Sequence, residues 1–305
     1  MKVSVIMTTY NGRRFLREIL DSLQNQTRLI EELLIFDDKS TDETVSYVQK
    51  YIFEHRIKNW YIIENEINLG WEKNFYQGLL KASGDIIYPC DQDDIWHLDK
   101  IEKMTQAFEE NDDIWLMVSG YNAFSEQRSR MVKQHAVKTE YNKKVSRVMF
   151  DEHYYQILRP GCTMAFRKEL LPLLAENWEP GTPHDAVLWI IASLLGKLYL
   201  YDDIFIEFRR HENNVSHVIK HGYSYKVNEV ERTKKINQWY LMSEFHAPDK
   251  VDLIDNVNKW CDLRKMLLTE RKLTAWFILF RYRSFYLTNK KYFGDLYYFS
   301  KQFKK

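Results

Sequence analysis

The chain has 305 residues, of which 45% are hydrophobic and 29% charged, and its formal net charge is +1. This length and composition predict one large globular domain with an appendage. Cys90, Cys162 and Cys261 are odd in number and far apart, which argues against a disulfide framework or a zinc site and predicts free thiols in a reducing compartment. No apolar run approaches the length of a membrane-spanning helix, and residues 1–7 do not resemble a signal peptide, so we expect a cytoplasmic protein.

The small net charge conceals an asymmetry along the chain. Residues 221–305 carry 17 Lys and Arg against 9 Asp and Glu, a net charge of +8, whereas residues 1–220 carry 27 against 34, a net charge of −7. Residues 271–305 interleave these cations with aromatic side chains. We expect this segment either to contact the inner face of the plasma membrane peripherally or to pack on the rest of the chain or on a second subunit, as in a homodimer. No nucleic-acid-binding module is recognisable, so no nucleic acid partner is expected.

The first ninety residues alternate between strand and helix patterns. We predict strands at residues 3–8, 32–36, 60–64 and 86–88, and helices at residues 13–26, 44–53 and 75–82. This order predicts an α/β protein with a doubly wound, mostly parallel sheet, whose ligands gather at the carboxyl ends of the strands. Thr8, Asp37, Asp38 and Asp91 all lie at such strand ends, which is unusual for a purely structural protein.

The fourth strand leads into three carboxylates within four residues, in the stretch Asp91-Gln92-Asp93-Asp94. Like charges this close repel one another, and a bound Mg²⁺ or Mn²⁺ is the usual remedy because hard cations prefer oxygen ligands. The alternative is a solvated acidic turn in which Asp94 or Asp99 caps the next helix.

The rest of the chain changes character twice. We predict further strands at residues 114–119, 161–166, 198–201 and 205–208, with helices at 168–175 and 186–195. Residues 125–150 are polar and irregular, which predicts a mobile loop. From about residue 223 long helical patterns appear without clear strands.

Seven short motifs occur in an order and spacing that is typical of one enzyme family. They are Val3–Asn11, Ile35–Asp42, Asn68–Gly70, Cys90–Asp94, Gly161–Thr163, His184–Asp185 and Arg209–His211. Over residues 1–217 the chain resembles the family 2 nucleotide-sugar glycosyltransferases, whose fold is called GT-A. The forms Asp-Gln-Asp-Asp-Ile-Trp, Gly-Cys-Thr-Met-Ala-Phe and His-Glu-Asn-Asn-Val-Ser look most like the rhamnosyltransferases that build bacterial surface polysaccharides.

The resemblance implies a domain organisation and a reaction. Residues 1–220 would form a catalytic domain, with a nucleotide-sugar-binding half at about 1–120 and an acceptor half at about 121–220, and residues 221–305 would form a helical region. The reaction would transfer a sugar with inversion, for example rhamnose from dTDP-rhamnose, to a glycan or lipid-linked acceptor. Alternatives are a UDP-sugar donor, such as UDP-galactose or UDP-N-acetylglucosamine, and an inactive sugar-nucleotide-binding scaffold. A nicotinamide-dependent oxidoreductase is disfavoured because no Gly-x-Gly-x-x-Gly follows the first strand.

The resemblance also implies a divalent metal, Mn²⁺ or Mg²⁺, that stabilises the diphosphate leaving group. Asp93 would bind the metal directly, and Asp91 would contact the ribose or the metal. His211 would be a second metal ligand or a diphosphate contact. Arg209 and Arg210 would neutralise the diphosphate, although alternation along a strand sends only one of them inward.

Other motif positions imply contacts to the nucleotide sugar. Thr8 and Tyr10 match the turn that binds the base. Asp38 would accept a hydrogen bond from the N3–H of thymine or uracil, which does not separate dTDP from UDP. Asn68 and Lys73 would face the same donor pocket.

The acceptor side of the site rests on fewer residues. Asp185 is implied as the general base that deprotonates the acceptor hydroxyl, and its place near a helix start also fits a helix cap. His184 stands where the family more commonly has Glu, and it would contact the acceptor or orient Asp185. Asp94 would orient sugar or acceptor hydroxyls, unless it caps the next helix.

Overall fold

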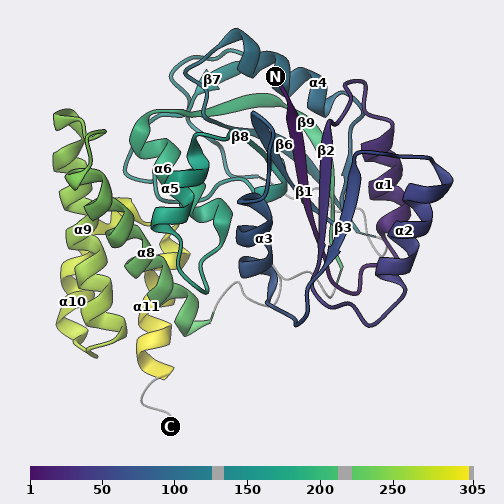
Figure 1. The fold of residues 1–305 in the computed structure, drawn as a ribbon. Helices are drawn as coiled ribbons and strands as arrows, with labels where there is room; N and C mark the ends of the chain where they lie inside the picture. Colours follow the sequence, from purple (N-terminus) through teal and green to yellow (C-terminus); the bar gives the residue numbers. More distant parts are fainter. Residues whose placement is uncertain (126–133, 212–221, 302–305) are drawn as a thin grey trace. The chain divides into compact units, whose positions relative to one another are not determined.

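The computed structural model describes residues 1–125, 134–211 and 222–301 (Figure 1). The Glu-Asn-Asn-Val-Ser part of the last motif (212–216), residues 126–133 of the predicted loop and the last four residues lie outside these ranges. The chain divides into two compact units. The first comprises residues 1–148, 158–188 and 197–211, and the second combines 149–157 and 189–196 with the helices that follow residue 221. The division into catalytic and helical domains at residue 220 stays a prediction.

One nine-stranded sheet is the framework of the first unit, in the order β3-β2-β1-β4-β8-β6-β9-β5, with β7 paired to β9. Its strands are β1 (Val3–Thr9), β2 (Glu32–Asp37), β3 (Trp60–Glu64), β4 (Ile86–Asp91), β5 (Ile95–Trp96), β6 (Leu116–Phe124), β7 (Val145–Arg147), β8 (Met164–Arg167) and β9 (Leu198–Arg209). The helices of the same part of the chain are α1 (Leu16–Gln24), α2 (Thr44–Glu54), α3 (Trp71–Leu79), α4 (Lys100–Glu110), α5 (Leu170–Asn177) and α6 (His184–Leu195), with a 3₁₀ turn, η1 (Gly161–Thr163). Figure 1 shows α1 and α2 beside the strands β1 to β3.

The strands β3, β2, β1 and β4 are parallel, as predicted. Every residue of β1 is buried, because helices cover both faces of this half of the sheet. Val5 and Met7 belong to the core that α1 and α4 complete. Ile6 points to the other face, where a Cβ on Gly78 of α3 would lie 3.0 Å from its Cγ2. The near-continuous apolar run of the first strand reflects this burial on both faces.

The other half of the sheet mixes strand directions. The strand β8 is antiparallel to both β4 and β6, β6 is parallel to β9, and β5 and β7 are antiparallel to β9. The predicted strands 198–201 and 205–208 are one strand, β9, because shifts in its register with β6 near Gly120 accommodate the polar residues between them. The expectation of a loop is wrong for residues 145–147, which form β7.

The helix predicted at residues 75–82 begins earlier, at Trp71. Its N-cap residue, Gly70, has a φ of 81°, in the left-handed region that glycine adopts without strain. The carboxylate of Asp38 accepts hydrogen bonds from the backbone N–H groups of Leu69 (2.7 Å) and Gly70 (2.9 Å). This carboxylate fixes the turn before the helix, which the spacing of apolar residues alone does not reveal.

The second unit is helical, as its sequence pattern predicts. It contains α8 (Tyr223–Met242), α9 (Pro248–Leu268), α10 (Leu273–Leu279), the 3₁₀ segment η2 (Phe280–Phe285) and α11 (Asn289–Lys301). Within the described ranges, no helix is both long and apolar enough to span a membrane.

A buried ion-pair network ties these helices together. Arg264 of α9 donates to Asp295 of α11 at 2.7 Å and to Glu229 of α8 at 2.9 Å. Lys226 of α8 and Tyr286 also donate to Asp295, at 2.6 and 2.8 Å. Asp295 is fully buried, so losing one partner would leave an uncompensated buried charge. The network therefore makes α11 an integral part of this unit.

Candidate active site

The carboxyl ends of β1, β2 and β4 bring the predicted polar side chains together. In the strand register Thr8 lies opposite Asp91, and Thr9 lies opposite Asp37. The hydroxyl of Thr9 donates to Asp37 at 2.8 Å. Asp37 is fully buried and also accepts from the backbone N–H and hydroxyl of Ser40, at 2.8 and 2.6 Å. Asp37 thus holds the turn after β2, and the convergence expected at this edge of the sheet is observed.

Asp38 is the next residue and is also buried. Besides the N–H groups of Leu69 and Gly70, its carboxylate accepts from the amide of Asn65 at 2.9 Å. A carboxylate offers about four lone-pair positions, so three donors leave about one for a ligand. Asn68 donates to the backbone carbonyl of Asp38 at 3.0 Å, which places it in the same turn.

Lys73 and Tyr10 are the other two residues predicted to contact the donor, and the structure holds them differently. Lys73 is exposed on α3. The side chain of Tyr10 is 48% exposed, but its backbone is held by Gln92, whose amide accepts from the Tyr10 N–H at 2.9 Å and donates to its carbonyl at 3.1 Å. A Cβ on Gly12 would lie 2.0 Å from Oε1 of Gln92, so a larger residue at this position would have to displace the Gln92 side chain.

The three carboxylates at the end of β4 and directly after it do not form a solvated turn. Asp91 and Asp93 are half-buried, and Asp94 is 1% exposed. Burial, followed by the charges of Asp93 and Asp185, raises the pKa of Asp91 to about 7. Burial, followed by the charges of Asp93 and Asp91, raises the pKa of Asp94 well above its ordinary value. These shifts favour the protonated forms of Asp91 and Asp94, and a bound cation would favour their charged forms instead.

Asp94 does not cap the next helix. The helix α4 begins at Lys100, and Asp99 occupies its N-cap position, as one of the alternatives predicts, but makes no side-chain capping bond. Asp94 instead accepts from the backbone N–H of Arg209 through Oδ1, at 3.1 Å. Its Oδ2 is buried without a hydrogen bond, which is unusual for a carboxylate oxygen.

His211 and Arg209 come from the end of β9 and reach the same loop. Nε2 of His211 lies 2.7 Å from Oδ2 of Asp93, and its ring stacks on Phe15 with centroids 4.6 Å apart. Arg209 is buried and donates to the backbone carbonyl of Asp93 at 2.9 Å and to Glu18 at 2.5 Å. Arg209 is thus the inward-pointing member of the predicted arginine pair, and it supports the acidic loop.

His184 and Asp185 begin α6. Both ring nitrogens of His184 are buried without hydrogen bonds, and its ring lies against Phe75 with centroids 4.5 Å apart. Burial lowers the pKa of His184, which favours the neutral imidazole. A Cβ on Gly161 would lie 3.1 Å from Nε2 of His184 and 3.2 Å from the Cβ of Asp185, so the backbone of η1 approaches both residues closely.

Asp185 combines a helix-start position with nearness to the acidic loop. Its Oδ1 accepts from the N–H of Ala186 at 2.8 Å, in the first turn of α6. Its charge contributes to the raised pKa of Asp91, which places the two carboxylates in one electrostatic site. The arrangement is compatible with both roles that the sequence suggests for Asp185.

Lys100 is the main residue of the site that sequence reasoning missed. It is fully buried, its ammonium donates to the carbonyl of Cys162 at 2.8 Å, and it lies 3.4 Å from the ring centroid of Trp96. Burial lowers its pKa to about 8, although the charges of Asp94 and Asp91 oppose that shift. Lys100 therefore lies close enough to Asp94 and Asp91 to interact with their charges.

A sequence signal for Lys100 did exist. Lys100, Met104 and Phe108 are spaced by four residues and share the buried face of α4. A lysine that begins such an apolar stripe must either bend its ammonium to solvent or find buried partners. The partners here come from a distant part of the chain, so only the structure identifies them.

The donor set suits a hard divalent cation. Asp91 and Asp93 offer carboxylate oxygens, and His211 offers an imidazole that already faces Asp93. Among the described residues, one group whose ligand atoms all lie within 4.8 Å of one another is Asp91, Asp94 and Cys162. Burial raises the pKa of the Cys162 thiol well above its ordinary value, so this sulfur is a poor ligand for Mg²⁺ or Mn²⁺.

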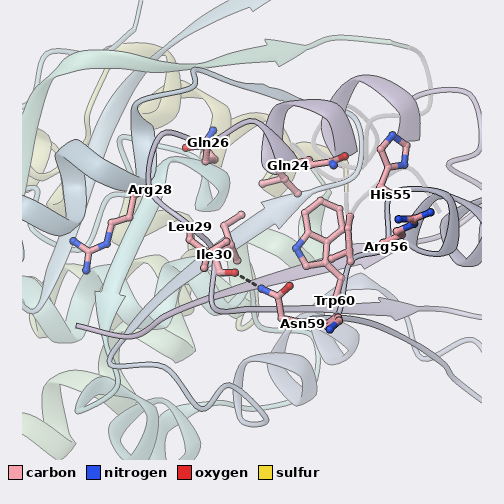
Figure 2. A pocket seen from close by; sticks show the side chains of 12 residues that line it. Gln24, Gln26, Arg28, Leu29, Ile30, His55, Arg56, Asn59 and Trp60 are labelled. Carbon is pink, nitrogen blue, oxygen red and sulfur yellow. Dashed lines mark hydrogen bonds between the residues drawn. The ribbon is translucent and has the colours of Figure 1, made fainter.

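A separate cavity of about 340 Å³ lies at the opposite end of the strands (Figure 2). It is bordered by residues just before β2 and by Trp60 at the start of β3, where Asn59 donates to the carbonyl of Ile30. None of its lining residues is Asp or Glu. Ligands of such sheets bind at the carboxyl ends of the strands, so this cavity is not the candidate active site.

Comparison with known proteins identifies a family to which the sequence is similar. The sequence profile of Glycosyl transferase family 2 matches residues 4–173, which is more than half of the chain. The dTDP-rhamnosyl transferase RfbG of Shigella flexneri is 29% identical over 249 residues, which cover 77% of this chain and 80% of that protein.

Two solved structures share the fold. TarS 1-349 of S. aureus, in complex with UDP-GlcNAc, has a TM-score of 0.66 at 20% identity, over 87% of this chain and 73% of that one. The mannosyltransferase PcManGT from Pyrobaculum calidifontis, in complex with GDP-Man and Mn²⁺, has a TM-score of 0.53 at 14% identity, over 98% of this chain and 84% of that one.

Proposed function

Because the chain belongs to glycosyl transferase family 2, we propose that it moves a sugar from a nucleoside diphosphate to an acceptor hydroxyl with inversion and with the help of a divalent metal. The glycosyltransferase class and the GT-A type α/β fold are those predicted from the sequence. One observation carries the proposal. The acidic loop after β4, the His211–Asp93 pair and Asp185 share one electrostatic site at the carboxyl ends of the strands.

Asp185 is the proposed general base. As the acceptor oxygen forms a bond to the anomeric carbon, the bond from that carbon to the diphosphate oxygen breaks, and the hydroxyl proton passes to Asp185. The contact from Ala186 N–H to Oδ1 orients the carboxylate at the first turn of α6. Neutral His184, packed beside Gly161, would border the acceptor, and Asp94 would orient sugar or acceptor hydroxyls.

Asp93, Asp91 and His211 would hold the cation, which we propose to be Mn²⁺ or Mg²⁺. A bound cation would neutralise the charge that develops on the diphosphate leaving group. An imidazole in the donor set favours Mn²⁺ over Mg²⁺. Arg209 keeps the carbonyl of Asp93 in place and adds a positive charge near the diphosphate.

The donor base would be a pyrimidine. The remaining acceptor position of Asp38 suits an N3–H donor, and the exposed ring of Tyr10 can pack on the base or ribose, with Thr8 beside it. Asn68 would shape the pocket, and Lys73, exposed on α3, would reach the donor from its edge.

The proposed donor sugar rests on the similarity of this chain to known proteins. The similarity to a dTDP-rhamnosyl transferase supports dTDP-rhamnose, and the fold shared with a UDP-GlcNAc complex supports a UDP-sugar as the alternative. We propose a glycan or lipid-linked acceptor of bacterial surface polysaccharide synthesis. An inactive scaffold is disfavoured because Asp91, Asp93, Asp185 and His211 are all present.

A thermal-shift screen tests donor and metal together. The full chain is heated with dTDP-rhamnose, UDP-N-acetylglucosamine or GDP-mannose, each with Mn²⁺, Mg²⁺ or a chelator. A ligand that binds the folded state raises the midpoint of unfolding according to its affinity. We expect a pyrimidine donor with Mn²⁺ to give the largest rise.

Two variants sharpen the screen. Asp93→Asn should lose the metal-dependent part of the rise, and Asp112→Asn, a change at a 97% exposed carboxylate, should keep it. Slow hydrolysis of the same donor distinguishes an enzyme from a scaffold. If no nucleotide sugar stabilises the protein with either metal, the proposal fails.

A further inference from the structure

The helices α10 and α11 have an inner face that is committed to the second unit. Ala275, Leu279, Tyr292 and Phe299 are buried, and Asp295 carries the ion pairs to α8 and α9. The part of the chain that the sequence presented as either a packed appendage or a membrane contact is therefore packed along one side. The opposite side of the same helices is exposed.

That opposite side carries large aromatic side chains. Phe277 is 64% exposed and Phe280 is 58% exposed, and their spacing of three residues places them on one face. Phe293 and Tyr297 of α11 are 58% and 53% exposed and are four residues apart. Four large aromatic side chains are therefore more than half exposed within residues 277–297, which is unusual for a surface that contacts only water.

The ring of Trp276 lies between the exposed aromatic side chains of α10 and those of α11. Its centroid lies 5.4 Å from that of Phe277 and 6.3 Å from that of Phe293. Trp276 therefore connects the exposed Phe277 of α10 with the exposed Phe293 of α11. Phe280 and Tyr297 lie beside these two residues by their spacing of three and four along the chain.

Cations lie directly on this surface. The guanidinium of Arg283 lies 5.1 Å from the ring centroid of Phe280, and the ammonium of Lys301 lies 4.9 Å from that of Tyr297. Residues 271–301 contain seven Lys and Arg and one acidic residue, the buried Asp295, which is a net charge of +6. We call Phe277, Phe280, Phe293, Tyr297, Arg283 and Lys301 the aromatic–basic face.

We propose that the aromatic–basic face docks on an anionic lipid surface. Exposed aromatic rings favour the boundary between headgroups and acyl chains, and each Lys or Arg near an anionic surface adds about 1 kcal/mol of attraction. Since no described helix is long and apolar enough to cross the bilayer, the contact is peripheral. A second copy of the same face is disfavoured as the occupant because both surfaces would be positively charged.

The experiment uses the full chain and vesicles of two compositions, phosphatidylcholine alone and phosphatidylcholine with phosphatidylglycerol. Co-sedimentation should be strong with the anionic vesicles, weak with the neutral ones, and reduced by added salt. The triple variant Phe277→Ser, Phe280→Ser, Phe293→Ser should bind about tenfold more weakly or worse. Arg283→Gln with Lys301→Gln should weaken binding by about fivefold per charge removed.

The matched control is Phe53→Ser, which removes an 83% exposed phenylalanine from α2, outside this unit. It should bind like the unmodified chain. All substituted side chains are exposed, so the midpoint of unfolding should not change. Truncation before residue 271 is unsuitable because it removes Asp295 from the ion-pair network.

Three results would overturn the proposal. The triple variant could sediment with vesicles as the unmodified chain does, or the unmodified chain could bind neutral and anionic vesicles equally. The unmodified chain could also fail to bind vesicles and form a dimer that the triple variant dissociates, which would assign the face to a second copy. Lipid binding does not depend on the transfer reaction, so donor hydrolysis without vesicles should be the same in all these variants. Loss of that hydrolysis would bear on the proposed function instead.

Discussion

The replacement Asp185→Asn separates the proposed base from its structural surroundings. Asparagine keeps an oxygen that can accept from the N–H of Ala186, so the first turn of α6 should retain its contact at 2.8 Å. It removes the group that would take the acceptor proton. The change therefore tests the chemistry of Asp185 with little effect on the fold.

Two effects of opposite sign are expected. A positioned base contributes about 100- to 10,000-fold to the rate, which corresponds to about 3–5 kcal/mol of activation free energy. The charge of Asp185 is also one cause of the raised pKa of Asp91. Removing that charge should lower the pKa of Asp91, so Mn²⁺ should bind as well as before or more tightly near pH 6.

The assay measures transfer at saturating donor and, separately, the Mn²⁺-dependent rise in the unfolding midpoint. Asp249→Asn is the matched control, because Asp249 also lies in the first turn of a helix, in the second unit. It should change neither quantity. A transfer rate for Asp185→Asn within about threefold of the unmodified enzyme, with donor still bound, would refute the assignment, since a general base is worth at least about 100-fold.

Three further predictions concern the surroundings of the metal site. The folded-state pKa of Asp91 is about 7, above its ordinary value of 3.8, so Mn²⁺ must displace a proton to bind below pH 7. The Mn²⁺ affinity measured in titrations should fall about tenfold for each pH unit below 7 and should be constant above pH 7. The metal-free protein should lose stability as the pH rises from 3.8 to 7, because the folded state then binds more protons than the unfolded state. Lys100→Met removes a cation that lowers the pKa of Asp91, so the midpoint of Mn²⁺ binding should move up by about one pH unit. Lys103→Met, a change at a half-buried lysine of the same helix that pairs with Asp99, should not move it. Gly12→Ala should displace the glutamine side chain that would lie 2.0 Å from the added Cβ and weaken donor binding about tenfold in calorimetry, unlike Gly222→Ala, where nothing lies within 4 Å. Unchanged values in the Lys100 or Gly12 variants would contradict the roles given to these residues.

The polar side chains at this edge of the sheet could be predicted because the pattern that marks them involves only neighbouring residues in the sequence. Each of the first strands is a short apolar run followed at once by a polar residue, and parallel strands place such residues side by side. The register of Thr8 with Asp91 follows from that rule. The pairing of His211 with Asp93 could be anticipated only by resemblance, because 117 residues separate the two in the chain.

Other features depend on distant partners and could not be predicted. The sequence does not show that Arg209 meets Glu18, or that Lys100 meets the carbonyl of Cys162. The same holds for residues 149–157 and 189–196, which belong to the second unit although the chain around them belongs to the first. Long-range packing decides each of these cases, and local periodicity carries no information about it.

The buried network of the second unit has a consequence for sequence variation. Arg264 is shared between Asp295 and Glu229, and Asp295 is shared between Arg264 and Lys226. Because loss of a single member leaves a buried charge unpaired, these four positions should vary together among relatives or not at all. Relatives with an apolar residue in place of Asp295 should also lack the arginine at 264. Such covariation would identify the chains that keep the helices of the aromatic–basic face.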